Sequence, residues 1–315
     1  MAQKSVLGVE LTDQCIRLVC LKLAKNKKYQ IEFAVEGNLE KGAVVSRTIV
    51  NIESVVESFK KLISHYKIKN KKVAIAIDSR NVISKTIEFD EALSERDIEH
   101  QLEFDSDKHI PDSSDEVCLD FQILGASESK AKQSVLVVAT HKEPVDIYSE
   151  IIDAAGLSLE IVDVYHYVLL RVCESIQFCE GYEYSSDSCL AFVDLDFWRS
   201  QLTIIADGNV QLQEDFKFKK KVVDAHGVEE VVPWYKRHLQ IFSSNHKNRD
   251  IDCIILYGEN AKIEGITKLF AFITGKPVYL ANPYIGMSQL NPQNIDEKSY
   301  KYLISAGLAL REVMS

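Results

Sequence analysis

The stretch Cys189-Leu190-Ala191-Phe192-Val193-Asp194-Leu195-Asp196-Phe197-Trp198 is an apolar run that ends in acidic residues and a turn. A second stretch of this kind, Val6-Leu7-Gly8-Val9-Glu10-Leu11-Thr12-Asp13, lies near the start of the chain. Another apolar run follows each of them, so each predicts a strand, a short turn and a second strand. A unit that occurs twice about half a chain apart indicates an internal duplication. In a two-lobed α/β protein the two turns would face each other across a cleft.

The composition is that of a soluble globular protein. The 315 residues suit two domains or one large two-lobed domain, and 46% of them are hydrophobic. No apolar run approaches the ~18 residues needed to span a bilayer. Strand-like sequence directly follows Met1-Ala2-Gln3-Lys4, which predicts a cytosolic chain without a signal peptide. The seven cysteines are scattered without a CxxC pair, which favours buried thiols over disulfides or a metal site.

The formal charge of −10 does not favour nucleic acid or anionic lipid as a general partner. Three basic clusters occur nevertheless, at residues 25–28, 67–72 and 217–221, and each lies at a predicted turn or strand end. Their simplest interpretation is solvated loop charge.

The first part of the chain predicts an α/β unit with a further unit inserted in it. From about Asn81 the pattern changes to a strand, a polar helix and two more strands, which indicates a small α/β subdomain. The predicted strands are 6–11, 16–23, 29–35, 73–77, 82–89, 117–123, 134–140 and 159–164, and the predicted helices are 55–66, 91–108, 144–155 and 165–176.

The last part of the chain repeats the strand pattern of the first. Pro233 interrupts a helical region, so one helix should end near Val232 and the next should start at Pro233. The other predicted elements are strands 190–195, 201–206, 210–216, 253–256 and 278–280, and helices 263–273 and 302–313. The expected division is a first lobe of 1–80 and 141–186, an inserted subdomain of 81–140, a second lobe of 187–301 and a C-terminal helix of 302–315, with 181–187 as the linker between lobes.

A set of short segments, taken in order, carries a resemblance to a known family. They are Glu103-Phe104 through His109-Ile110-Pro111, 117–124, Ala155-Gly156-Leu157, Val162-Asp163-Val164, 237–242, Leu256-Tyr257-Gly258, Asn282-Pro283-Tyr284 and 307–311. Together they resemble PilM, the actin-like cytoplasmic family of the type IV pilus assembly machinery, over nearly the full length of the chain.

The resemblance implies a two-lobed actin-like fold, a duplicated ribonuclease H-like fold shared with FtsA, with a small α/β subdomain inserted in the first lobe. It implies ATP with Mg²⁺ between the lobes. It also implies that the short N-terminal cytoplasmic tail of the inner-membrane protein PilN docks in a groove formed with the inserted subdomain. Segments 82–89, 102–110 and 117–124 are the candidates to line that groove by strand addition.

The implied location is the inner face of the inner membrane, where the chain is held by its partner without inserting into the membrane. Other proteins of the pilus assembly platform are further expected partners, and nucleic acid is not. A homodimer stays open, because proteins of this fold dimerise or polymerise.

Both phosphate turns depart from the Asp-x-Gly pattern of actin-like proteins, in which the acid orients Mg²⁺ and the glycine lets N–H groups approach phosphate. Asp196 replaces a glycine, and a carboxylate ~4 Å from a phosphate charge costs ~4 kcal/mol at an effective dielectric of about 20. That is roughly a thousandfold in affinity. The adenosine-side turn has Tyr257 and Glu259 around one glycine. The family-aligned positions are Glu10, Thr12, Asp13, Arg17 (where the family often has lysine), Asp194, Asp196 and Gly258.

Two interpretations of these residues stand side by side: a weak Mg–ATP site, or turns that are now only scaffold, which we favour. The sequence predicts a non-enzymatic adaptor with a degenerate ATP site, and no catalytic or metal-ligating residues. An active ATPase of the pilus or of an FtsA-like division machinery is the first alternative, although the C-terminal amphipathic helix of FtsA is not seen. A GspL-like protein would have a transmembrane segment. A sugar kinase would need intact phosphate turns and a catalytic Asp.

Overall fold

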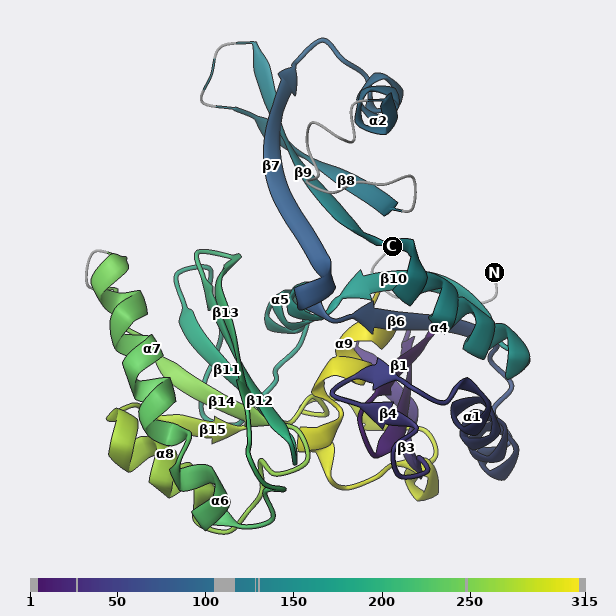
Figure 1. The fold of residues 1–315 in the computed structure, drawn as a ribbon, viewed down its shortest axis with the longest axis vertical. Coiled ribbons are helices and arrows are strands. Elements are labelled where there is room, and N and C mark those ends of the chain that lie inside the picture. Colours follow the sequence, from purple (N-terminus) through teal and green to yellow (C-terminus); the bar gives the residue numbers. More distant parts are fainter. Residues whose placement is uncertain are drawn as a thin grey trace. The chain divides into compact units, whose positions relative to one another are not determined.

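The computed structural model describes residues 5–26, 28–104, 117–127, 129, 131–246 and 249–311. The chain divides into two compact units, residues 1–76 with 152–315 and residues 77–151 (Figure 1). Each unit is described by itself. Within the described ranges no helix is both long and apolar enough to cross a membrane.

The larger unit contains two sheets of the same design. The first has the order β10-β6-β1-β2-β3-β16, in which β1, β2 and β3 are antiparallel neighbours and β6 runs parallel to β1. The predicted strands are present with small changes at their ends. They are β1 (Leu7–Leu11), β2 (Cys15–Leu23), β3 (Tyr29–Asn38), β6 (Lys72–Ile77), β10 (Ser158–Val164) and the short β16 (Ser288–Gln289).

The second sheet has the order β13-β12-β11-β14-β15, again with three antiparallel strands followed by parallel ones. The central strands β1 and β11 therefore hold equivalent places, each paired with its hairpin partner on one side and a parallel strand on the other. This duplicated order is that of the actin-like fold and confirms the predicted fold class. The strands are β11 (Cys189–Leu195), β12 (Arg199–Ala206), β13 (Asn209–Lys217), β14 (Cys253–Tyr257) and β15 (Val278–Leu280).

Helices α5 (Tyr165–Ser175) and α9 (Leu303–Ala309) pack against each other and against both sheets. One buried cluster joins Ala74 of the first sheet and Phe192 of the second to side chains of these two helices. Gly8 is required in β1, because a Cβ there would lie 1.9 Å from the carbonyl oxygen of Ser305 in α9. We call the first sheet with α1 (Ile52–Tyr66) the first lobe.

The second lobe is the second sheet with α6 (Ala225–Glu229), α7 (Val232–Asn245) and α8 (Ile266–Thr274), whose apolar faces bury a separate core. The helical region divides as predicted, since α6 ends at Glu229 and α7 begins at Val232 with proline in its first turn. Helix α8 begins later than the predicted residue 263.

Short 3₁₀ helices are η1 (Ser79–Asn81), η2 (Pro292–Asn294) and η3 (Ser299–Lys301).

A small hairpin between β3 and α1 was not predicted. Its strands, β4 (Val44–Val45) and β5 (Thr48–Ile49), pair antiparallel. The loop residues Ser46 and Arg47 both have positive φ, 51° and 61°. Such a loop usually selects Asn-Gly or Asp-Gly, so no sequence signal marks it.

The smaller unit is an antiparallel sheet in the order β7-β9-β8, with one face covered by α2 (Glu95–Phe104). Ile98 and Leu102 of α2 are buried against Phe89, Val135 and Val137 of the sheet. The predicted helix 91–108 begins at Glu95, and its end lies outside the described residues. The strands are β7 (Val82–Asp90), β8 (Val117–Ala126) and β9 (Lys132–His141), and α4 (Lys142–Ala154) continues into the larger unit.

All seven cysteines have free thiols and six of them are buried, in agreement with the prediction. The exception, Cys118 in β8, is partly exposed.

Candidate functional site

The turn between β1 and β2 is closed by its own threonine. Thr12 Oγ1 accepts hydrogen bonds from the N–H groups of Gln14 at 3.3 Å and Cys15 at 3.1 Å. The same hydroxyl donates to the Cys15 carbonyl at 3.2 Å. N–H groups at the tip of such a turn are what would approach a phosphate. Here two of them already have an acceptor within the turn.

Asp13 faces the unpredicted hairpin. Its two carboxylate oxygens accept the N–H groups of Ser46 and Arg47, both at 2.9 Å. Both residues of the β4–β5 loop hold the left-handed conformation, which costs about 1–2 kcal/mol for a residue other than glycine. The two hydrogen bonds that Asp13 accepts offset part of that cost. Asp13 thus anchors the loop that carries Arg47.

Arg47 extends from this loop to the end of β11, where its guanidinium pairs with the carboxylate of Asp194. The two side chains are only 6% and 5% exposed. Burial raises the pKa of Asp194 to about 7, while the charge of Arg47 acts in the opposite direction. The guanidinium also lies 4.0 Å from the centre of the Tyr165 ring, and the Tyr165 hydroxyl donates to Glu10. Arg47 therefore links the first lobe to the second.

A second ionic link is centred on Arg17, which is 1% exposed. Its Nη1 lies 3.2 Å from Glu10 Oε2, its Nε lies 3.6 Å from Glu36 Oε2, and its Nη2 pairs with Glu259 of the second lobe. Lys301 Nζ lies 3.1 Å from Glu36 Oε1 and 3.0 Å from Glu259 Oε2. Two cations thus hold three carboxylates from both lobes.

The charges in this cluster stabilise one another against burial. Burial alone would raise the pKa of Glu259, but Arg17 and Lys301 outweigh it and hold that pKa below its ordinary value. Burial would likewise lower the pKa of Lys301, and Glu259 with Glu36 raises it instead. Glu259 and Lys301 are therefore both charged near neutral pH.

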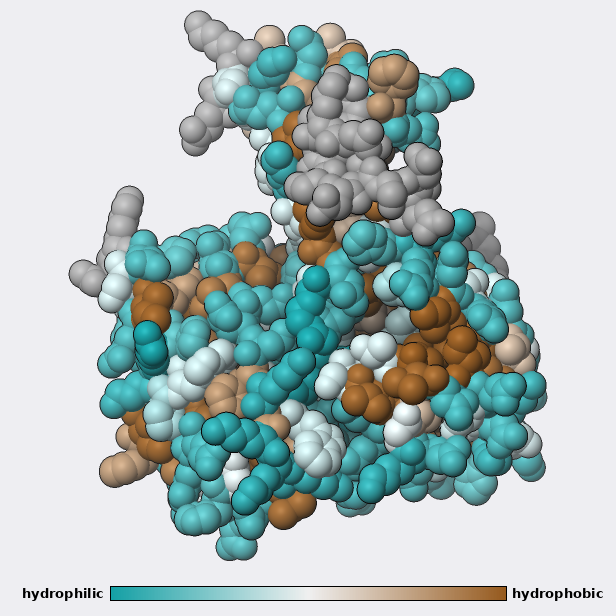
Figure 2. Space-filling model, viewed as in Figure 1, coloured by the Kyte–Doolittle hydropathy of each residue, from teal (hydrophilic) through white to brown (hydrophobic). Residues whose placement is uncertain are grey.

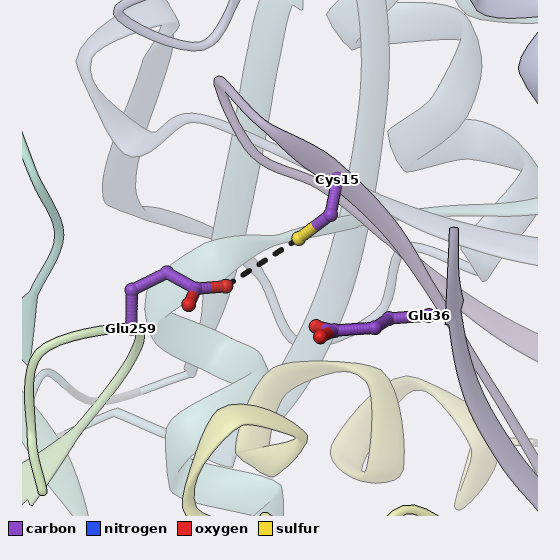
Figure 3. A group of neighbouring side chains, drawn as sticks. All are labelled: Cys15, Glu36 and Glu259. Carbon is purple, nitrogen blue, oxygen red and sulfur yellow. Dashed lines mark hydrogen bonds between the residues drawn. The ribbon is translucent and has the colours of Figure 1, made fainter. Parts of the chain in front are cut away.

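Three side chains of this cluster have the composition of a metal site. Figure 3 shows Cys15, Glu36 and Glu259 pointing toward one another. One ligand atom of each lies within 4.8 Å of those of the other two. The Cys15 thiol donates to Glu259 at 3.5 Å. Burial raises the pKa of Cys15 to about 12, so it is a thiol and not a thiolate. Because Arg17 and Lys301 already neutralise both carboxylates, the arrangement does not favour a metal.

Asp196, in the turn between β11 and β12, is directed back into its own turn. Its Oδ1 accepts the N–H of Phe197 at 2.7 Å, and its carbonyl accepts from Asn260 Nδ2 at 3.1 Å. Burial raises the pKa of this carboxyl group as well. A buried carboxyl group therefore occupies the position at which the resemblance led us to expect glycine.

Gly258, after β14, is required by packing within the second lobe. Its φ is +92°, and a Cβ on it would lie 2.3 Å from Asp194 Oδ1. Gly258 thus packs against the same carboxylate that pairs with Arg47.

A cavity of about 950 Å³ opens beside the two turns, a volume that suits a small-molecule site. Figure 2 shows hydrophilic residues along the boundary between the lobes. Lys221 Nζ lies 4.4 Å from the centre of the Phe197 ring at the cavity wall. The walls are of mixed charge and include Asp13, Glu36, Glu259, Lys41, Lys217, Lys221, Lys301, Phe197 and Trp198.

The predicted positions gather around the interlobe turns, where they contact one another and other side chains of the chain. Sequence reasoning missed the partners Glu36, Arg47, Tyr165 and Lys301, and took Glu259 only as added bulk and charge. The predicted positions are Glu10, Thr12, Asp13, Arg17, Asp194, Asp196 and Gly258, and their contacts are those given above.

Comparison with known proteins gives matches over almost the whole chain. The family model described as type IV pilus assembly protein PilM matches residues 8–226 and 220–313. A chain of a PilM–PilN type IV pilus biogenesis complex is 18% identical over 99% of both chains, with a TM-score of 0.75. A Bacteroides thetaiotaomicron protein with an actin-like ATPase fold and unknown function is 13% identical over 98% of this chain and 96% of its own, with a TM-score of 0.47. The cytoplasmic domain of EpsL from the type II secretion system of Vibrio cholerae is 11% identical over 99% of this chain and 95% of its own, with a TM-score of 0.44.

Proposed function

The chain belongs to the PilM family of type IV pilus assembly proteins, and from this premise we propose that it is a non-enzymatic adaptor of the inner-membrane assembly platform. It binds the cytoplasmic tail of a PilN-like membrane protein and is held at the inner face of the membrane by that partner. The similarity to a chain of a PilM–PilN complex supports the choice of partner.

The observation that carries the proposal is the occupation of the interlobe turns by the chain's own side chains. Arg47 neutralises Asp194, Thr12 takes up two turn N–H groups, and Arg17 lies between Glu10 and Glu259. These are the groups on which an Mg–ATP complex would depend. The lobes are thus joined by protein ion pairs, and the adaptor keeps one form whether or not nucleotide is present.

The smaller unit offers two strands for peptide capture. In the described part of this sheet β9 is central, so β7 and β8 are the edges. An edge strand presents unpaired backbone groups that can accept a further strand. Two of the segments expected to line the groove, 82–89 and 117–124, belong to these edges. The third, 102–110, is described only as far as Phe104.

The backbone register tests strand addition. Successive amides of an added strand point alternately toward and away from the sheet. A tail peptide N-methylated on one alternate set of amides should therefore lose binding to the full chain. The same peptide methylated on the other set is the control and should keep most of its affinity, as measured by fluorescence anisotropy. Equal effects of the two sets would rule out strand addition.

Two exposed apolar residues then identify the edge. Ile83 of β7 is 41% exposed and Leu124 of β8 is 55% exposed, so neither Ile83→Lys nor Leu124→Lys should disturb the core. Each is the matched control of the other. We expect one of them to weaken peptide binding while the thermal unfolding of both stays that of the unmodified chain.

Independence from nucleotide is tested by titrating the tail peptide calorimetrically with and without Mg–ATP. We expect the same Kd in both titrations. A large change in Kd on adding Mg–ATP would contradict an adaptor held closed by its own ion pairs.

One observation favours a second candidate, a weakly nucleotide-binding ATPase. The cavity of about 950 Å³ lies beside both turns and could receive a nucleotide. ATP hydrolysis by the purified chain well above that of the Glu10→Ala, Asp194→Ala variant would replace the adaptor proposal with this one.

A further inference from the structure

One end of the first sheet, opposite the interlobe turns, gathers the starts and ends of several strands. Leu7, the first residue of β1, pairs with Cys20 near the end of β2 and with Val73 near the start of β6. The β2–β3 hairpin closes at the same end, where the Ala24 N–H donates to the Lys28 carbonyl at 2.8 Å. The turn at Thr12 lies at the other end of β1. In Figure 1 the end of the sheet that carries Leu7 and the β2–β3 hairpin is the one at which β6 begins.

The segment between α1 and β6 is fixed at this end by Asn70. Its Nδ2 donates to the Ser5 carbonyl at 2.9 Å, and its Oδ1 accepts the Lys72 N–H at 3.1 Å. The Ser158 N–H also donates to the Lys71 carbonyl at 2.8 Å, which adds the start of β10. Lys25 and Lys28 of one lysine-rich segment and residues 67–72 of the other therefore lie at the same end of the first sheet.

Lysine dominates the surface of this end. Lys25 and Lys28 on the hairpin are exposed, and so are Lys67, Lys69 and Lys71 on the other segment. Among the residues that the structure describes, these five take part in no ion pair. Lys22 and Lys72 lie beside them, 2.7 Å from Glu32 and 3.7 Å from Glu160. A chain of net charge −10 thus has a strong local excess of positive charge at this end.

The chemistry of this surface indicates which partner it suits. Protein interfaces are usually centred on aromatic or arginine anchors with an apolar core. Neither segment contains an arginine, and none of the exposed large apolar side chains of the described chain lies in them. Lysines are flexible, hydrated point charges without the fork that binds a carboxylate in two places. They suit a diffuse layer of negative charge.

We propose that this basic end rests on the surface of an anionic phospholipid membrane, by electrostatic contact and without insertion. The net negative charge of the whole chain opposes recruitment from a distance, but screening limits that repulsion to a Debye length of about 8–10 Å. The contact therefore acts on a chain that its partner already holds near the membrane, and it determines which side of the protein faces the lipid.

Co-sedimentation of the full chain with lipid vesicles tests the proposal. The probes are vesicles of phosphatidylcholine alone and vesicles that also contain phosphatidylglycerol, at low and at physiological salt. The variant Lys67→Gln, Lys69→Gln, Lys71→Gln removes three charges from the basic end. At about 1 kcal/mol per lysine near an anionic surface, it should partition on the order of a hundredfold less. The variant Lys236→Gln, Lys262→Gln, Lys268→Gln removes three exposed charges from the second lobe and is the matched control.

The proposal expects binding only to the anionic vesicles, weakened by salt and lost in the first variant alone. Equal loss in both variants would assign the effect to net charge and overturn it. Absence of binding at low salt, or equal binding to the neutral vesicles, would also overturn it. A chain that binds polyglutamate but no vesicle would assign the basic end to an acidic protein instead. Because all six lysines are exposed, both variants should unfold at the same temperature as the unmodified chain.

Discussion

Arg47 and Asp194 form a buried ion pair that joins the two lobes. The arginine comes from a two-residue loop that Asp13 holds by two backbone N–H groups, and the acid lies next to the last residue of the central strand β11. Tyr165 lies against the guanidinium and donates to Glu10. The pair can form only when the first and second lobes are closed on each other.

Replacement of Arg47 by methionine keeps the aliphatic bulk and removes the charge. It leaves Asp194 buried without its cation, so we expect the free energy of unfolding to fall by about 3–5 kcal/mol. Lys61→Met, which breaks the exposed pair with Glu57, is the control and should change it by at most about 1 kcal/mol. Urea denaturation measures both. Similar small losses in the two variants would mean that the interlobe pair contributes little.

Gly258→Ala should be far more damaging than a change at another glycine with positive φ. The new Cβ would lie 2.3 Å from Asp194 Oδ1, and the left-handed backbone adds strain. We expect a loss of about 2–5 kcal/mol. Gly275 has a φ of +73° and no atom within 4 Å of an added Cβ. Gly275→Ala therefore isolates the backbone contribution and should lower the free energy of unfolding by about 1–2 kcal/mol. Thermal unfolding of the two variants compares them, and equal losses would contradict the packing role of Gly258.

The titration of Asp194 should be visible in the pH dependence of stability. Burial raises its pKa from 3.8 to about 7, so the folded chain binds the proton more tightly than the unfolded chain does. This contribution to stability is complete at acid pH and is lost as the pH rises through about 4 to about 7. Asp194→Asn cannot titrate. The unfolding free energy of the wild type minus that of the variant should therefore decrease across this interval, as urea denaturation at several pH values would reveal. A difference that stays constant would contradict the raised pKa.

Asp196→Gly tests how far this one carboxylate weakens nucleotide binding. Removing a negative charge about 4 Å from a phosphate should tighten Mg–ATP binding by up to roughly a thousandfold. Asp196→Asn removes the charge but keeps the size, and so separates repulsion from steric exclusion. Isothermal titration calorimetry measures both. If neither variant binds more tightly than the wild type, the obstacle lies in the Thr12 turn and in Arg47.

The fold could be predicted because its signals are local. Apolar strands such as 190–195 and the proline at 233 each predict their element without information from elsewhere in the chain. The repeated strand–turn–strand unit indicated the duplication, and the strand order came from the structure. The position of the candidate site followed from the two turns. Whether those turns bind nucleotide is the question that the titrations above address.

The contents of the site could not be predicted, because its partners are distant in sequence. Arg17 and Glu259 are separated by 242 residues, and Arg47 and Asp194 by 147. No periodicity or motif pairs such residues. The hairpin that carries Arg47 has strands of two residues, too short for an alternating pattern, and its loop lacks the usual Asn-Gly signal.

The core shared by the two sheets determines whether the larger unit can be divided into two fragments that fold separately. Helices α5 and α9 bury side chains against strands of both halves, so neither half would retain a complete interior if it were expressed alone. A fragment that begins at residue 187 would lack α5 and expose Phe192 and Ile255 to water. Such a fragment should aggregate or require the other half in trans. The duplication that is visible in the topology is thus a record of ancestry, and we expect the larger unit to fold as a single piece.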